Sequence, residues 1–158
     1  MSVTRRGLRM PDRDYEGATV KAGILENATY PADTLTDQKT GRKYPDPRAG
    51  MAVATIAAAL NYGTAKIPPR PFMEMTLARE QATWINGLTK LIAGGMSVSE
   101  ALRTIGQVMK EDIRQTIVDW PADNSERWAE SKGFNHGLTF TYHMLNSVES
   151  EIETPGGG

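Results

Sequence analysis

The sequence has no cysteine and only two histidines among its 158 residues. Without cysteine there are no disulfides, no thiol nucleophile and no thiolate metal ligand. His136 and His143 stand seven residues apart and lack the further ligands that zinc needs. A phosphate-binding loop and a nucleophile motif are missing as well. We therefore expect no catalytic, cofactor-binding or metal-binding residue, and no cofactor.

Long apolar runs and a strong net charge are also missing. No apolar run approaches the roughly 18 residues of a membrane span. The 18 basic and 19 acidic residues leave a net charge of −1. Proteins that attract nucleic acids or anionic membranes through their overall charge are typically basic, so this balance is untypical of them. The length fits one domain. We expect one soluble intracellular domain.

The two ends of the sequence differ from the middle. Residues 1–18 carry four arginines without periodicity and predict a flexible basic arm. Residues 19–25 alternate apolar and polar side chains, which is the period of a half-buried strand. A similar alternation near the other end predicts a last strand that pairs with the first. The domain is thus expected over residues 19–153, with a flexible tail at 154–158.

Residues 28–50 hold almost no apolar side chains, which is unusual for so long a connection in a compact domain. Thr40 and Gly41 form a candidate turn, with Leu35 and Tyr44 on either side of it. Two alternatives remain open, a protruding β-hairpin and a flexible loop. Either one is solvated or lies on a neighbouring subunit.

Helical patterns fill most of the centre. Residues 51–60 are rich in alanine and predict a helix that ends near Gly63. A second helix begins at about Phe72 and has an apolar stripe of Met73, Leu77, Trp84, Leu88 and Leu91. Ser97, with Glu100 three residues later, is typical of the start of a third helix. The short turn between the last two makes them antiparallel. The predicted fold is α+β, a small mainly antiparallel sheet packed against two antiparallel helices.

A rigid connector precedes the second helix. It contains three prolines within four residues, which restrict φ and remove amide donors. Its residues are Ile67, Pro68, Pro69, Arg70, Pro71 and Phe72. We expect Arg70 to hold a carboxylate or carbonyl groups through its planar guanidinium, with an exposed arginine as the alternative.

The last predicted strand carries three glutamates, Glu149, Glu151 and Glu153, in alternate positions. They should line one face of the strand, as a solvated or negatively charged surface rather than as an acid–base pair. A short helical turn is predicted just before this strand, over residues 138–145.

Several of these segments together resemble a family. Residues 20–25, 53–57, 61–64 and 67–72 resemble, in this order, the tail-completion or neck proteins of long-tailed bacteriophages, the tail-terminator-like minor tail component family of lambdoid and related phages. The two central helices and the segment up to Val148 are similar too. The resemblance spans about residues 19–152, and its most specific part is the Pro-Arg-Pro-Phe element at 69–72.

The resemblance implies a structural virion protein rather than an enzyme. Such subunits form a ring, generally a hexamer, at the head–tail junction, where it completes or terminates the tail and joins it to the head connector. Implied partners are further copies of the chain, the tail tube or sheath protein and the head–tail connector proteins, and the genome passes through without specific binding. The implied location is the neck of the virion, after assembly in the host cytoplasm.

Roles for individual residues follow from this implied assembly. The connector would lock the second helix against the sheet. The hairpin or loop at 28–50 would reach an adjacent subunit or the tail tube through Tyr30, Leu35, Arg42, Lys43 and Tyr44. The three glutamates would face the lumen of the ring and repel DNA phosphates. Two alternatives remain: a head-completion ring on the portal, and a small cytosolic enzyme or regulator.

Overall fold

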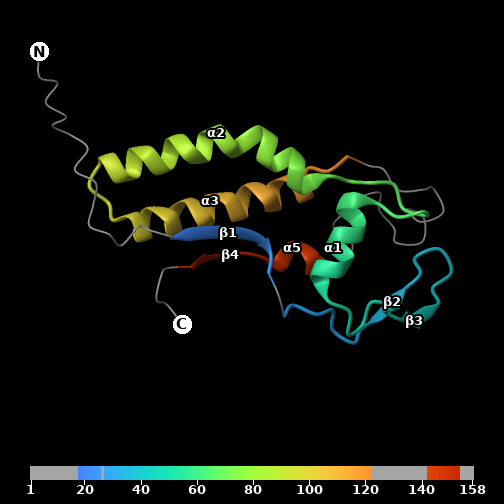
Figure 1. The fold of residues 1–158 in the computed structure, drawn as a ribbon. Helices are drawn as coiled ribbons and strands as arrows, with labels where there is room; N and C mark the ends of the chain where they lie inside the picture. The colour runs from blue at the N-terminus through green and yellow to red at the C-terminus, as the bar shows by residue number, and fades with distance from the viewer. Residues whose placement is uncertain (1–17, 26, 122–141, 154–158) are drawn as a thin grey trace, which may run out of the picture.

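The structure is a computed structural model that describes residues 18–25, 27–121 and 142–153 (Figure 1). Its elements in chain order are β1 (Thr19–Ile24), β2 (Thr34–Thr36), β3 (Lys43–Pro45), α1 (Val53–Tyr62), α2 (Phe72–Ala93), α3 (Val98–Val118), α5 (His143–Asn146) and β4 (Val148–Glu153). The predicted α+β class is confirmed. The predicted N-terminal arm, the C-terminal tail and His136 lie outside the described residues.

The first and last described strands form an antiparallel ribbon, as their alternation predicted. In the register Thr19 faces Glu153 and Ile24 faces Val148. Val20 and Ala22 point toward the helices, whereas Lys21 is exposed on the other face. In Figure 1 the ribbon lies along α3, with α2 beyond it.

Helix α3 packs closely on the ribbon because it carries a glycine at the contact. A β-carbon at position 106 would lie 2.8 Å from Cγ2 of Val20 and 3.3 Å from Ser150. The next residue also contacts the ribbon, since Gln107 Nε2 donates to Ser150 Oγ over 3.2 Å. Gly106 therefore sets how near the helix can approach the strands.

The antiparallel pair of α2 and α3 is also confirmed. Ser97 caps α3, since its hydroxyl oxygen accepts from the amide of Glu100 over 3.2 Å. Between the helices, Trp84 Nε1 donates to the Asp112 carboxylate over 2.6 Å, and the buried hydroxyl of Thr76 donates to that of Thr116 over 2.7 Å. Polar bonds as well as apolar contacts thus hold this pair.

The apolar stripe predicted for α2 is only partly buried. Trp84 is 8% exposed, as expected for a core position, but Leu77 is 48% exposed. The physical reason is that the sheet has only two strands. This narrow ribbon lies under α3 and leaves part of α2 uncovered.

The main core lies where α1, the start of α2, the end of α3 and β4 meet. Phe72 and Val53 are at its centre, with 1% and 0% exposure. The cluster consists of Tyr30, Val53, Ala57, Phe72, Ile113, Ile117, Met144, Leu145 and Val148. Segments far apart in the sequence therefore close one core around the first residue of α2.

The segment at 28–50 forms the predicted β-hairpin rather than a loop without strands. Leu35 on β2 faces Tyr44 on β3, and the turn lies between Asp37 and Arg42 as the Thr-Gly pair predicted. The Asp37 carboxylate accepts from two backbone amides of the turn, and Gly41 has a φ of 70°. Figure 1 shows the hairpin at the side of the molecule away from the α2–α3 turn.

We predict that Gly63→Ala destabilises the fold by roughly 3 kcal/mol, because two effects add. Gly63 ends α1 with a φ of 77°, and a β-carbon there would lie 2.8 Å from the backbone nitrogen of Pro69 and 2.9 Å from the carbonyl oxygen of Ile67. Urea denaturation measures the change in the free energy of unfolding.

Gly41→Ala is the matched control. Gly41 also has a positive φ, but no atom lies within 4 Å of the added β-carbon. Its substitution should cost roughly 1 kcal/mol, from backbone strain alone. Equal losses in the two variants would contradict the close approach of the connector to Gly63.

Candidate functional site

The described part of the chain contains no group of three or more histidine or acidic side chains that could hold a metal ion. Among the helices in these ranges, none is both long enough and apolar enough to cross a membrane. What the described residues do present is three structural features: the connector before α2, the β2–β3 hairpin with its base, and the β1–β4 ribbon with the grooves beside it.

The connector is fixed by a buried asparagine at the end of α1. Asn61 is 4% exposed, and its amide oxygen accepts from the backbone nitrogen of Met73 over 3.1 Å. Its amide nitrogen donates to the Glu74 carboxylate over 3.0 Å. Asn61 thus satisfies a free amide in the first turn of α2 from a different helix, as an N-cap residue does.

The connector residues themselves pack against several elements of the chain, while their locking role stays a prediction. Phe72 is the most buried of them and belongs to the same core cluster as Val148 of β4. Arg70 is 7% exposed, so the alternative of an exposed arginine is wrong, and its backbone nitrogen donates to the carbonyl oxygen of Leu60 over 2.8 Å. The connector therefore joins α1, α2 and the ribbon.

A partly buried ion pair holds the base of the hairpin. Arg48 Nε and Nη2 donate to the two carboxylate oxygens of Asp46 over 2.9 and 2.8 Å, the two-point geometry typical of strong pairs. The guanidinium carbon of Arg48 lies 4.5 Å from the centre of the Tyr30 ring, a cation–π contact. The hairpin is thereby fastened to the core through a tyrosine.

His143 completes this cluster from the other end of the chain. Its ring centre lies 5.0 Å from that of Tyr30, and its Nε2 donates to the carbonyl oxygen of Thr29 over 2.8 Å. The hydrogen bond from Arg48 holds the pKa of Asp46 below its ordinary value. Burial raises the pKa of the Tyr30 hydroxyl. Asp46 is therefore held as a carboxylate beside a neutral tyrosine.

Two of the residues expected to contact a neighbouring subunit contact their own chain instead. Tyr30 is 3% exposed and Leu35 is 7% exposed, so the surface of neither is available to a partner. Tyr30 is buried because Arg48 and His143 cover its ring.

The remaining three expected contacts lie farther out on the hairpin. Arg42 and Lys43 are exposed, and Tyr44 is half-buried. Within the described ranges, the side chains of Arg42 and Lys43 have no ion-pair or hydrogen-bond partner. Their positive charges are therefore available on the surface, although a contact with another subunit stays a prediction.

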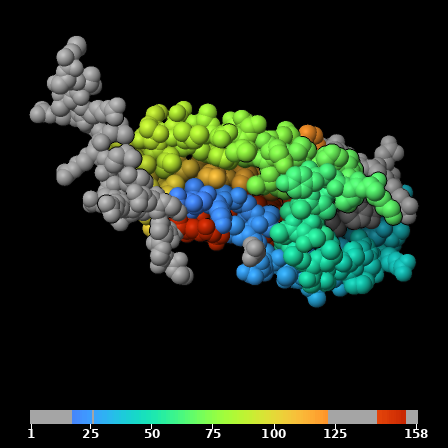
Figure 2. Space-filling view, in the orientation of Figure 1, coloured from blue at the N-terminus to red at the C-terminus, as the bar shows by residue number. Residues whose placement is uncertain are grey.

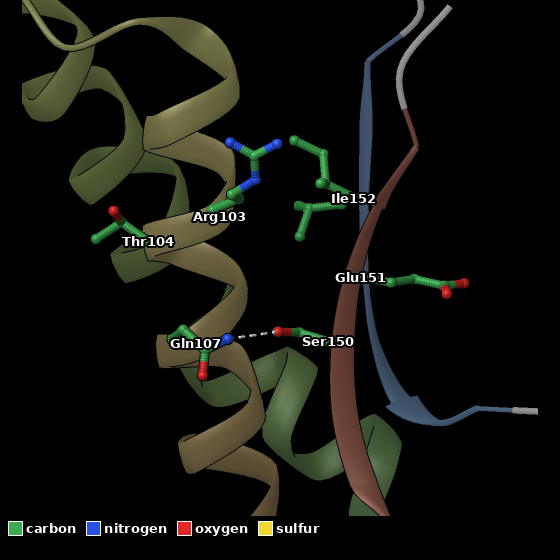
Figure 3. A pocket seen from close by; sticks show the side chains of 7 residues that line it. Arg103, Thr104, Gln107, Ser150, Glu151 and Ile152 are labelled. Carbon is green, nitrogen blue, oxygen red and sulfur yellow. Dashed lines mark hydrogen bonds between the residues drawn. The ribbon is translucent and has the colours of Figure 1, made fainter. Parts of the chain in front are cut away.

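The three glutamates of β4 line the exposed face of the ribbon, as predicted. Glu149 pairs with Lys110 over 2.9 Å and Glu153 pairs with Lys21. Glu151 has no such partner among the residues described, and Figure 3 shows its side chain pointing away from α3. The row therefore has part of its charge neutralised by the chain's own lysines.

A groove of about 370 Å³ runs beside β4, between this strand and α3 (Figure 3). Five of its seven lining residues are polar; the lining consists of Val20, Arg103, Thr104, Gln107, Ser150, Glu151 and Ile152. Arg103 is exposed and makes no hydrogen bond or ion pair with another described residue. A second groove, of about 210 Å³, lies on the β1 side and is mainly apolar, with Ala22, Met73, Glu74, Leu77, Trp84, Met109 and Ile113 around it.

Each groove lies beside a strand edge that has no paired strand in the part of the chain described. Each strand of the ribbon pairs only with the other, so one edge of β1 and one edge of β4 keep unpaired backbone groups. Such edges are sites at which a further strand can be added.

No protein-family model, no curated protein and no solved structure matches this chain. The resemblance to phage neck proteins therefore depends on the residues quoted for it. The surface features described above come from the structure and do not depend on that resemblance.

Three residues that organise these surfaces were not predicted from the sequence: Asn61, Asp46 and Arg48. An aspartate followed by proline is a turn signal, and an arginine two residues later is within reach of its carboxylate. That pattern could have indicated the ion pair. Nothing local indicated Asn61, because its partners lie on the next helix.

We predict that Asp46→Asn lowers the free energy of unfolding at neutral pH by about 2 kcal/mol, because Arg48 loses its charged partner. The pKa of Asp46 is lower in the folded state than in the unfolded state. Its contribution is therefore complete above about pH 4 and is lost as the pH falls further.

The difference between Asp46→Asn and the unchanged chain should shrink between pH 7 and pH 3, as measured by urea denaturation at each pH. Asp33→Asn, at an exposed position in the same segment, is the control and should change little at either pH. A difference that stayed constant with pH would show that the Asp46 charge is not what stabilises the hairpin base.

Proposed function

We propose that this protein is a structural virion subunit that forms a ring at the head–tail junction of a long-tailed bacteriophage, where it completes the tail and joins it to the head connector. The observation that carries the proposal is the incomplete sheet. Within the described residues, two strands with free edges lie beneath helix α3, and a groove runs beside each edge. The order of strand, helix, connector, helix pair and strand agrees with the resemblance.

An incomplete sheet favours assembly for a physical reason. A two-stranded ribbon is barely stable alone, and its unpaired amide and carbonyl groups can bond to another chain. The surfaces beside its edges differ, because the β4 groove is more polar than the almost wholly apolar β1 groove. Two different patches on one subunit suit a head-to-tail contact, the kind that closes into a ring.

In this proposal the hairpin and the acidic row have separate tasks. The hairpin carries Arg42, Lys43 and Tyr44 to an adjacent subunit or to the tail tube. The row on β4 faces the lumen and repels DNA phosphates, so that the genome passes without binding. A lumen found to be neutral or basic in the assembled ring would remove the second task.

Native mass spectrometry of the purified full chain tests the ring directly. We expect a closed oligomer, generally a hexamer, and ring-shaped particles in electron micrographs. A chain that stays monomeric at every concentration, and is missing from purified virions, would contradict the proposal and favour an enzyme or regulator.

Deletion of the gene separates tail completion from head completion. For tail completion we expect full heads beside unattached tails, or tails of uncontrolled length. Heads that leak their DNA would instead assign the protein to a ring on the portal.

We predict that the double variant Arg42→Glu/Lys43→Glu weakens assembly without weakening the fold. Because both side chains are exposed, the free energy of unfolding should change by less than about 0.5 kcal/mol. Reversal of two charges at a contact should repel the partner surface, so native mass spectrometry should show more free subunit. Lys66→Glu, an exposed charge reversal in the loop after α1, is the control. Unchanged assembly in the double variant would exclude the hairpin from the contact.

A further inference from the structure

Helix α2 has a row of uncharged residues with regular spacing, all exposed except the half-buried Ile92. Successive members stand alternately three and four residues apart along almost the whole helix. They are Met75, Ala78, Ala82, Ile85, Thr89 and Ile92, and we name this row the α2 seam. The spacing is that of positions a and d in a coiled coil.

The seam is not used within the described structure. Met75 is 49% exposed and Ile85 is 56% exposed, although both are large apolar side chains. The residues of α2 that face α3, such as Thr76 and Trp84, lie on another side of the helix. Figure 2 shows α2 along an outer edge of the molecule.

The composition of the seam indicates which kind of partner fits. Ala78 and Ala82 leave room for a second backbone to approach closely, and Met75 and Ile85 supply knobs at either end of this pair. A strand would match only some of these positions, because its side chains repeat every two residues. A second helix matches all of them.

We propose that the α2 seam binds the α2 seam of a second copy of this chain, with the two helices parallel. The charges that flank the seam favour this occupant and this direction. Glu74 and Arg79 stand five residues apart on opposite sides of the seam, the positions that pair between the two strands of a parallel coiled coil. Each copy supplies both partners, so the pair forms twice.

Both charged side chains can take part without leaving their present contacts. Glu74 uses one carboxylate oxygen for Asn61. Arg79 uses Nε for Glu80 and Nη2 for Thr116, and a guanidinium has five donors. In an antiparallel pair with the seams aligned, Arg79 would instead lie beside Asn86 of the other copy, which carries no charge.

This contact goes beyond the proposed ring and does not depend on it. It is two-fold, so the same surface serves both copies and the contact closes at two chains. If the ring also forms, the seam either pairs subunits within it or joins two rings, and the total number of subunits is even.

Single cysteines test the seam cleanly, because the chain has no cysteine of its own. In a parallel pair, positions 78 and 82 each face their own equivalents. We expect Ala78→Cys and Ala82→Cys to form covalent dimers of the full chain on mild oxidation. Thr83→Cys is equally exposed but lies off the seam, and it should remain uncrosslinked.

Two other results would overturn the proposal. If Ala78→Cys crosslinks only when mixed with Thr89→Cys, the helices are antiparallel. If neither Ala78→Cys nor Ala82→Cys crosslinks while circular dichroism shows that both are folded, the seam does not bind a second copy.

A charge placed on the seam provides an independent measurement. Ile85→Glu should weaken dimerisation by about 10-fold or more in sedimentation equilibrium, because the contact would bury an unpaired carboxylate. Val108→Glu, at an exposed apolar position on α3, should leave dimerisation unchanged. Equal effects of the two variants contradict the seam. A ring that persists in Ile85→Glu shows that the proposed function holds without this contact.

Discussion

The antiparallel pairing of β1 with β4 is the constraint on which the other contacts depend. It joins residues 19–24 to residues 148–153 and gives α3 a surface on which to pack. Gly106 brings the helix close to that surface, and α3 in turn holds α2 through Trp84 and Thr76. Without the ribbon, the helix pair would lose its lower layer and β4 its part in the core.

The same constraint explains why so much apolar surface stays exposed. Only α3 lies fully over the ribbon, so Leu77 on the lower side of α2 and Ile85 on its outer side both remain half exposed. Exposed apolar side chains of this size, arranged in rows, are typical of surfaces that bind a partner. The described part of the chain thus leaves rows of large apolar side chains exposed, which supports the assembly proposed above.

The sequence predicted the elements well because their signals are local. Alternation indicated both strands, the 3.6-residue period indicated the helices, and Ser97 with Glu100 marked the start of α3. Burial was predicted less well, since it depends on distant segments. Tyr30 is buried by Arg48 and His143, one of which lies more than a hundred residues away. The same difference applies to the surface features. The acidic row on β4 could be predicted from the spacing of its glutamates. The role of Asn61 could not, because its hydrogen bond to Met73 forms only where α2 begins beside it.

The register of the ribbon also determines how it responds to mechanical force. Thr19 and Glu153 are partners at one end of the ladder, so the chain enters β1 and leaves β4 side by side. Tension applied through these two points pulls across the strands and opens the hydrogen-bonded pairs one after another, like a zipper. Strands pulled along their length would have to break all pairs at once. Any machinery that pulls on residues 19 and 153 will therefore separate the ribbon one residue pair at a time.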